Sequence, residues 1–364
     1  MSARHHRAIA AFAAVLATAG PAAAQDWPYE IEARVWVLAL ADAQARAQAP
    51  DPRRAREAEA RARGRQIQQQ WPEVTETFSR TVRLGPNGTL DLENFAGDVV
   101  ITGGRGDRVR IDAVKKVRNP RESQARTLLR ELVIDIGERG GNVEVRTRYP
   151  RVRNSFGTVD YTVAVPSGAN VTVRTISGHV RVTNVNGELR AETASGNIAA
   201  TGVRRVRLVK TMSGTIELSD GESDELTAST MSGNLVVRNV RGRFFDLQSV
   251  TGHVRLLNVE PDRVNLRSMT GDIEFLGRLA RSGRYEFQSH AGSIRLTPTN
   301  NQGFDIQANM MGGSFRSEYD LKIVQDTGRG PRQLGSRILR GTFGDAGAAI
   351  TAHSFGGDIV IARR

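Results

Sequence analysis

One short motif, in which a glycine follows Ser, Thr or Ala, recurs through the middle of this chain at a nearly constant spacing. Its glycines are Gly178, Gly196, Gly214, Gly233, Gly252, Gly271 and Gly292. Successive glycines are 18, 18, 19, 19, 19 and 21 residues apart. A fixed period of this size is typical of a solenoid, in which each repeat forms one coil that stacks on the next. A sandwich or barrel would not usually keep one residue type at one offset through seven units.

Apolar or small residues occupy alternate positions on both sides of each glycine. Leu226, Ala228 and Thr230 precede one motif, and Leu235 and Val237 follow it. A period of two indicates a strand with one buried face, so we expect two short strands and two corners in each coil of about 19 residues. The glycine supplies the backbone freedom that one corner needs. The last position of the first set is Ser or Thr in the regular coils, so its hydroxyls are expected to stack in a ladder from coil to coil.

One position breaks this alternation. Arg207 stands where an apolar residue is expected, between Val206 and Leu208. Burying an unpaired guanidinium costs too much free energy to be plausible in a thin core. We therefore predict a local β-bulge at Arg207.

Residues 1–24 have the pattern of a secretory signal peptide. Arg4 to Arg7 form a basic start, Ala8 to Ala19 an apolar run, and Ala22 to Ala24 a small-residue cleavage site. We expect the mature chain to begin at Gln25, and no later segment is long and apolar enough to span a membrane as a helix. Residues 25–73 are rich in Ala, Arg and Gln and are expected to be a helical or flexible spacer.

The remaining residues, 74–364, are predicted to form one solenoid domain. It begins with an irregular part, 74–168, in which Asn119 and Pro120 start a short helix that runs to about Leu132. Regular coils follow over 169–316. Residues 317–348 are expected to be an insertion rich in Arg and Gly, and 349–364 to hold the closing strand.

Several segments resemble one known family. They are residues 92–101 (LENFAGDVVI), residues 161–169 (YTVAVPSGA), the serial coils and the glycine-rich ending 341–361. Together they resemble the bacterial putative-adhesin family of β-strand-repeat envelope proteins, over roughly residues 74–364. The resemblance implies an all-β, right-handed β-helix or β-solenoid, a place at the cell envelope and no established catalytic residues.

The charge of the chain favours anionic partners. Lys and Arg number 51 against 39 Asp and Glu, which gives a formal net charge of +12. At the corner opposite the glycine, six arginines follow one another along the later coils: Arg241, Arg243, Arg263, Arg278, Arg281 and Arg284. Because coils stack at about 4.8 Å, we expect these side chains to form a stripe that binds anionic envelope polymers or lipid headgroups through bidentate hydrogen bonds. Specific nucleic-acid recognition is not expected.

The residue pattern offers no catalytic, metal or cofactor site. His179 and His253 occupy one corner column but are four coils apart, about 19 Å, which is too far for one metal ion. Glu217 and Glu274 are three coils apart and cannot act together on one glycosidic bond. The chain has no cysteine.

We therefore predict a non-catalytic, exported protein that binds or scaffolds at the envelope, in the periplasm, on the outer surface or after secretion. One alternative is a carbohydrate-active β-helix enzyme, a polysaccharide lyase or hydrolase. Another is a structural protein that self-assembles through its open coil edges.

Overall fold

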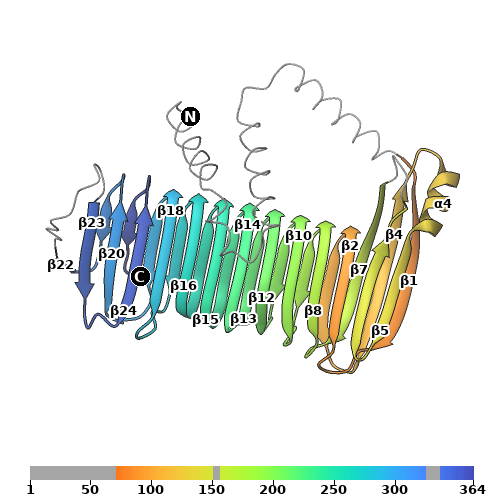
Figure 1. The fold of residues 1–364 in the computed structure, drawn as a ribbon, viewed down its shortest axis with the longest axis horizontal. Helices are drawn as coiled ribbons and strands as arrows, with labels where there is room; N and C mark the ends of the chain where they lie inside the picture. Colours follow the sequence, from red (N-terminus) through yellow and green to blue (C-terminus); the bar gives the residue numbers. More distant parts are fainter. Residues whose placement is uncertain (1–70, 151–155, 325–336) are drawn as a thin grey trace, which may run out of the picture. The chain divides into compact units, whose positions relative to one another are not determined.

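A computed structural model describes residues 71–150, 156–324 and 337–364, and all structural statements refer to these. They form an all-β solenoid with one helix (Figure 1). The predicted signal peptide and residues 25–70 of the predicted spacer lie outside the described residues, as do residues 325–336 of the predicted insertion.

Two parallel ladders of strands run along the regular coils (Figure 1). The ladder before the glycines contains β8 (Asn170–Ser177), β10 (Glu188–Ser195), β12 (Arg205–Ser213), β14 (Glu225–Ser232), the second halves of β15 (Leu235–Thr251) and β16 (Val254–Thr270), and β18 (Arg284–Ala291). The ladder after the glycines contains β9 (Val180–Thr183), β11 (Ile198–Thr201), β13 (Ile216–Glu222), the first halves of β15 and β16, β17 (Ile273–Gly277) and β19 (Ile294–Pro298). In β15 and β16 the strand continues through the second corner, where two separate strands were expected.

The alternation predicted from the sequence is confirmed by the burial of these strands. Leu226, Leu235 and Leu247 are inaccessible to solvent at the centre of one coil after another. Three aromatic rings extend this core toward the C-terminal coils, where Phe275 packs against Tyr285 and Phe287 with ring centroids 5.7 and 5.5 Å apart. A thin, continuous column of apolar side chains therefore joins all coils.

The predicted bulge at Arg207 is also confirmed. Leu189 pairs with Val206 but Arg190 pairs with Leu208, so the strand register shifts by one residue at Arg207. Its side chain is 45% exposed and forms an ion pair with Glu225, and it lies 4.0 Å from a carboxylate oxygen of Glu188.

The N-terminal end of the stack is built from β1 (Glu73–Arg83), β2 (Thr89–Ala96), β3 (Val99–Gly104), β4 (Arg108–Arg118), α4 (Glu122–Glu131), β5 (Val133–Arg139), β6 (Asn142–Arg148) and β7 (Phe156–Pro166). β2 and β3 form a coil that lies between β8/β9 and β6/β7. β4 pairs antiparallel with β7, and β1 pairs antiparallel with β4. β5 pairs antiparallel with β6. Antiparallel strands thus cover the end of the parallel stack.

The predicted short helix is present as α4 but starts later than expected. Asn119 accepts a hydrogen bond from the Arg121 backbone N–H at 2.9 Å, and the helix begins at Glu122. Asn119 therefore forms a turn before the helix and does not cap its first residue. Leu128 and Leu129 are buried, as is Leu132 just after the helix.

The C-terminal end differs from the prediction in the order of its coils. β20 (Phe304–Met310), β21 (Phe315–Ser317), β22 (Lys322–Val324), β23 (Arg337–Phe343), β24 (Ala348–Ser354) and β25 (Ile359–Ile361) complete the chain. β24 lies between β18 and β20, and β25 between β19 and β21. The last coil of the sequence is therefore inserted into the stack, and the strand predicted to close the stack at 349–364 does not do so. The covering strands are β23 and then β22, antiparallel and from the predicted insertion.

At the glycine corner the chain has no room for a side chain. Gly178, Gly196 and Gly214 have φ of +147°, +149° and +152°. A Cβ atom on any of them would lie 2.0 Å from the carbonyl oxygen of the corner glycine one coil earlier. Both the backbone angle and the close coil-to-coil approach therefore demand glycine.

The buried hydroxyls beside this corner bond differently from the predicted ladder. Thr211 and Thr230 each donate to the carbonyl of the corner glycine one coil earlier, at 3.0 Å. The Thr and Ser side chains are in register between coils, but the Thr211 and Thr230 hydrogen bonds run from hydroxyl to glycine carbonyl and not from hydroxyl to hydroxyl. A buried hydroxyl bonds to an acceptor within reach, and for these two side chains that acceptor is the corner carbonyl.

The residue after each corner glycine forms a second hydrogen-bonded column. Asn197 Oδ1 accepts from the Thr215 backbone N–H at 2.8 Å, and Asp272 Oδ1 accepts from that of Ser293 at 2.9 Å. His179 Nδ1 does the same for the N–H of Asn197 at 3.0 Å. The Asn, Asp and His residues at this position therefore share a side-chain acceptor that bonds to the next coil.

An outward-facing column lies two positions before each corner glycine, which we call the apolar ridge. In order along the stack it consists of Phe95, Ile176, Ala194, Met212, Met231, Val250, Met269, His290, Phe355 and Met311. Ile176 is 50% exposed and Met311 49%. The His290 and Phe355 rings stack with centroids 4.6 Å apart, which shows that the column continues through the inserted coil.

Candidate functional site

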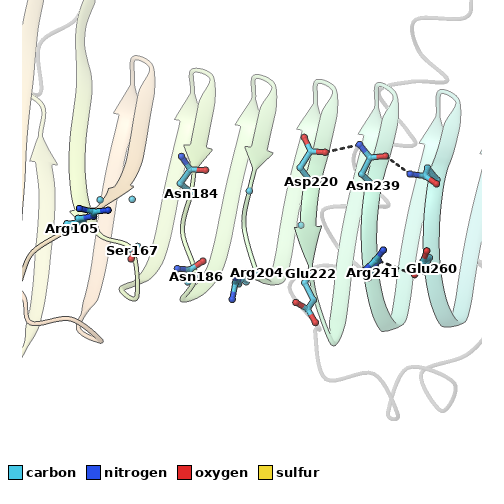
Figure 2. A pocket seen from close by; sticks show the side chains of 15 residues that line it. Arg105, Ser167, Asn184, Asn186, Arg204, Asp220, Glu222, Asn239, Arg241 and Glu260 are labelled. Carbon is cyan, nitrogen blue, oxygen red and sulfur yellow. Dashed lines mark hydrogen bonds and ion pairs between the residues drawn. The ribbon is translucent and has the colours of Figure 1, made fainter.

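The second corner, opposite the glycines, is turned by residues in the left-handed conformation. Asn184, Gly202, Asp220, Asn239 and Asn258 have φ between +52° and +66°. Asn and Asp tolerate this region because their short polar side chains bond locally. Figure 2 shows the result, in which Asn239 Nδ2 donates to Asp220 Oδ1 and Asn258 Nδ2 to Asn239 Oδ1, both at 2.8 Å. This amide ladder fixes the path of the corner.

A charged column runs beside the amide ladder, two residues further along each coil. In order it consists of Asn186, Arg204, Glu222, Arg241, Glu260 and Arg278. Its charges alternate in sign. Arg241 Nε lies 3.0 Å from Glu260 Oε2, and Arg278 lies 3.9 Å from the other oxygen of that carboxylate. The column therefore carries little net field along its length.

The two columns line a groove of about 720 Å³ (Figure 2). Gly103, Gly104 and Arg105 at the end of β3, together with Ser167, close it at the N-terminal side. Every side chain named in its lining is polar or charged, and the donors and acceptors recur from coil to coil. Such a groove suits an extended partner that carries repeated polar groups.

The structure separates the six arginines predicted to form one stripe into two groups. Arg241 and Arg278 belong to the alternating column, and Arg243 Nε lies 3.2 Å from Asp224 Oδ1. Arg263 and Arg284 lie directly opposite each other on β16 and β18, and Arg281 is exposed in the turn after β17. Within the described residues these last three, Arg263, Arg281 and Arg284, have no ion-pair partner.

Reading from the sequence missed Glu260, the acidic partner of Arg241 and Arg278. Glu260 occupies the same offset in its coil as Arg241 does in its own. A column-by-column alignment of the coils would have found it. The recurring pairs Asn184–Val185, Asn239–Val240 and Asn258–Val259 were a further signal for the corner.

The other residues considered for chemistry have structural partners. His253 Nδ1 accepts the Asp272 backbone N–H at 3.2 Å. Glu217 pairs with Arg238 at 2.6 Å and Glu274 with Arg255 at 3.6 Å. Among the described residues, no group of three or more His, Asp or Glu side chains is placed to hold a metal ion.

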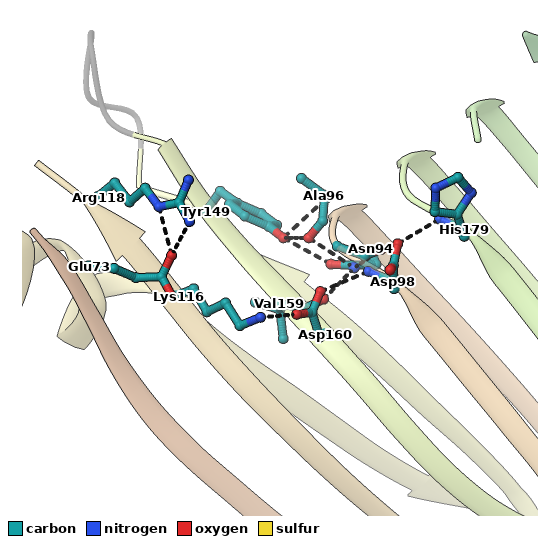
Figure 3. A network of polar contacts seen from close by, with 11 residues as sticks. Glu73, Asn94, Ala96, Asp98, Lys116, Arg118, Tyr149, Val159, Asp160 and His179 are labelled. Atoms are coloured by element: carbon teal, nitrogen blue, oxygen red, sulfur yellow. Dashed lines mark hydrogen bonds and ion pairs between the residues drawn. The ribbon is translucent and has the colours of Figure 1, made fainter. Parts of the chain in front are cut away.

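A second polar network lies at the N-terminal end (Figure 3). Asp160 accepts the Asp98 backbone N–H at 2.9 Å and pairs with Lys116 at 2.6 Å, and this carboxylate raises the pKa of Lys116. Asn94 stands in the column that holds Ser or Thr elsewhere, and its amide donates to the Val159 carbonyl at 2.9 Å.

The Tyr149 hydroxyl completes this network. It accepts from the Ala96 backbone N–H and lies 2.9 Å from both Asn94 Oδ1 and the Ala96 carbonyl. Burial raises the pKa of Tyr149, so the hydroxyl stays protonated. These contacts bind the first coil to the strands that cover it, which is a structural role.

The sequence model of the Toastrack DUF4097 family matches residues 88–361. Three solved structures are similar over most of their length. A putative adhesin from Bacteroides fragilis NCTC 9343 is 12% identical, with 79% of this chain and 97% of that chain covered and a TM-score of 0.38. A putative cell adhesion protein from Clostridium sporogenes ATCC 15579 is 10% identical, with 80% and 100% covered and a TM-score of 0.21. A putative lipid binding protein from Parabacteroides distasonis ATCC 8503 is 10% identical, with 79% and 97% covered and a TM-score of 0.36.

No curated protein matches the chain. In the part of the chain that the structure describes, no helix has the length and apolar character needed to cross a membrane.

Proposed function

The chain belongs to the Toastrack DUF4097 family, and from that premise we propose that it is a non-catalytic binding or scaffolding protein of the cell envelope. The basic, apolar and small-residue segments within residues 1–24 support export. The protein then acts in the periplasm, on the outer surface or after secretion. We also propose the right-handed coil direction that the family resemblance implies, which an experimental structure would check.

The proposed ligand is a linear anionic polymer or a surface of anionic lipid headgroups. The observation that carries this proposal is the position of Arg263 directly opposite Arg284 on neighbouring strands. Like charges directly opposite each other destabilise a sheet, so an anion that bridges the two guanidinium groups removes that repulsion. Phosphate, sulfate and carboxylate groups match the two-pronged donor geometry of arginine.

Arg281 lies in the turn just before β18 and adds a third cation without an ion-pair partner among the described residues. The other arginines contribute less to anion binding, because each already forms an ion pair with an acidic side chain. Arg241 has Glu260, and Arg243 has Asp224. The predicted six-arginine stripe is thus narrowed to three side chains near the C-terminal coils.

A matched pair of triple variants tests this proposal. Arg263→Gln/Arg281→Gln/Arg284→Gln removes the arginines without partners, and Arg241→Gln/Arg243→Gln/Arg278→Gln removes those with acidic partners. Both variants lose the same formal charge, so long-range attraction falls equally in the two. The mature protein and both variants are titrated with a sulfated glycan, lipopolysaccharide and vesicles containing anionic lipid, at several salt concentrations.

We expect the first variant to lose most of its affinity and salt dependence, and the second to retain most of both. Wild-type protein should also melt at a higher temperature in the presence of the polyanion, because binding to the folded state stabilises it. Equal losses in the two variants would mean that only net charge matters. No binding by the wild type at low salt would remove the proposed anion site altogether.

The absence of catalysis is part of the proposal and has its own test. The protein is incubated with a panel of acidic and neutral polysaccharides, and new reducing or unsaturated ends are measured over time. We expect none above the level of a heat-unfolded sample. Turnover that depends on the folded protein would favour the polysaccharide lyase or hydrolase alternative.

A further inference from the structure

The apolar ridge at the glycine corner is an exposed surface that the proposed anion site does not use. Phe95 is 53% exposed, Ile176 50% and Phe355 46%. Of the six methionines in the chain, four lie on this ridge: Met212, Met231, Met269 and Met311. Nine of the ten ridge residues are apolar, and the tenth is His290. Exposed apolar residues without a role are usually scattered singly, so a row of them indicates an interaction site.

The strip around the ridge has an unusual charge composition. In each of the ten coils it comprises the ridge residue, the small residue after it, the corner glycine and the residue after the glycine. None of these positions is Lys or Arg, although 51 of the 364 residues are. The few carboxylates in the strip, such as Asp98 and Asp272, accept a backbone N–H from the next coil. This corner is therefore poorly suited to anionic lipid or nucleic acid, which basic residues attract.

The shape of the strip is that of a ridge beside a trough. Each large ridge residue is followed by two small ones, as in Met212–Ser213–Gly214 and Met231–Ser232–Gly233. The two small residues form the trough. A twofold axis parallel to the stack places the ridge of each copy in the trough of the other copy. The coil spacing of the two surfaces is identical, so the fit repeats at every coil. No other partner is guaranteed to share this spacing of about 4.8 Å.

We propose that two copies of this chain associate side by side through the glycine corner, parallel and in register, each coil facing its own equivalent. A chain with a formal charge of +12 repels its copies over most of its surface. The strip has no Lys or Arg, so two copies can approach there without repulsion between basic side chains. The twofold axis makes the interface closed and self-complementary, as in most homodimers.

The size of the strip sets the strength of this contact. Ten coils at about 4.8 Å and a width of three residues give roughly 500 Å² per copy, or about 1,000 Å² in total. That area is at the lower limit for a specific interface, so the dimer should form in a concentration-dependent way. Because the contact contains few charges, added salt should not weaken it, in contrast to binding at the arginines.

Sedimentation velocity on the mature protein over a wide concentration range tests the proposal. Met212→Lys and Met212→Glu each bury a charge in the partner's trough and bring two like charges close together across the twofold axis, so both variants should remain monomeric. An equal mixture of the two should recover the dimer, because Lys of one copy then faces Glu of the other. Thr227→Lys and Thr227→Glu, on the outward face of β14, are the controls and should dimerise as the wild type does. Circular dichroism melts confirm that each variant is folded, and the same pair at Met269 repeats the test in another coil.

Each other outcome overturns the proposal. A wild type that stays monomeric at every concentration excludes the dimer. Met212 variants that dimerise like the wild type show that the ridge is not the interface. Failure of the mixture to recover the dimer excludes the parallel, in-register arrangement. A monomeric wild type that floats with zwitterionic phosphatidylcholine vesicles would identify the strip as a lipid-binding surface instead.

Discussion

Replacing Gly214 with alanine should unfold part of the stack, and the structure allows the cost to be divided into two terms. The first is backbone strain, because φ is +152° and an L-residue there costs about 1–3 kcal/mol. The second is steric, because the new Cβ would lie 2.0 Å from the Gly196 carbonyl oxygen. Restoring an ordinary contact of at least 3.4 Å requires the two coils to separate locally by about 1.4 Å.

That separation breaks hydrogen bonds between the two coils. Four bonds of 2.8 to 3.0 Å join them at this corner, donated by the backbone N–H groups of Gly196, Ile198 and Thr215 and by the Thr211 hydroxyl. At about 1 kcal/mol each, their loss adds up to about 4 kcal/mol to the strain. If all four bonds are lost, the substitution should therefore cost about 5–7 kcal/mol in total.

Two other glycines provide matched controls. Gly106 has φ of +118° and open space around its Cβ position, so Gly106→Ala measures strain without a clash. Gly137 has an ordinary φ, and its Cβ would be 4.0 Å from the nearest atom, so Gly137→Ala should be nearly neutral. Urea unfolding followed by far-ultraviolet circular dichroism would rank the three variants, and limited proteolysis would show whether unfolding starts at the altered corner. A loss for Gly214→Ala no larger than that for Gly106→Ala would refute the steric argument.

Three further predictions concern the core, the pH dependence and export. Leu247→Asp should unfold several coils, because it places an unpaired carboxylate at a fully buried position. Substitution of the outward-facing Gln248 should change the free energy of unfolding by less than about 0.5 kcal/mol. Similar losses for the two variants in melting curves would contradict the assigned alternation. Burial raises the pKa of Asp246 above 3.8, so the folded state favours the neutral carboxyl group. This stabilisation of the folded state is present at acid pH and is lost as the pH rises through the folded pKa. In urea titrations, Asp246→Asn should therefore be more stable than wild type at neutral pH and equal to it below about pH 3.8. Mass spectrometry of the exported protein should find Gln25 at the N-terminus, and an intact Met1 in the cytoplasmic fraction would exclude export.

Much of the fold was predictable because the repeating geometry of a solenoid gives its sequence a regular period. Alternation before and after Gly233 assigned the buried face of β14 and β15 correctly, since each position meets its own equivalent in the next coil. The bulge at Arg207 was predictable for an energetic reason, because a guanidinium cannot replace an apolar side chain in so thin a core.

The order of the terminal coils was not predictable in this way. A period gives the spacing of repeats but not their partners in space. Residues 348–354 have the same alternation as any other coil, so nothing local marks them for insertion between β18 and β20. The balance of charge at the arginines was missed for a related reason. The predicted stripe aligned only the arginines across the stack, whereas Glu260 occupies the same column and pairs with Arg241.

The inserted C-terminal coil has a consequence for how the protein is made. The coil that contains β20 and β21 cannot reach its final neighbours until β24 and β25 have been synthesised. A chain that ends early leaves the edges of β18 and β20 facing each other without the strand that joins them, and open strand edges promote aggregation and degradation. Completion of the stack therefore depends on β24 and β25, because they supply the neighbours of β18 to β21.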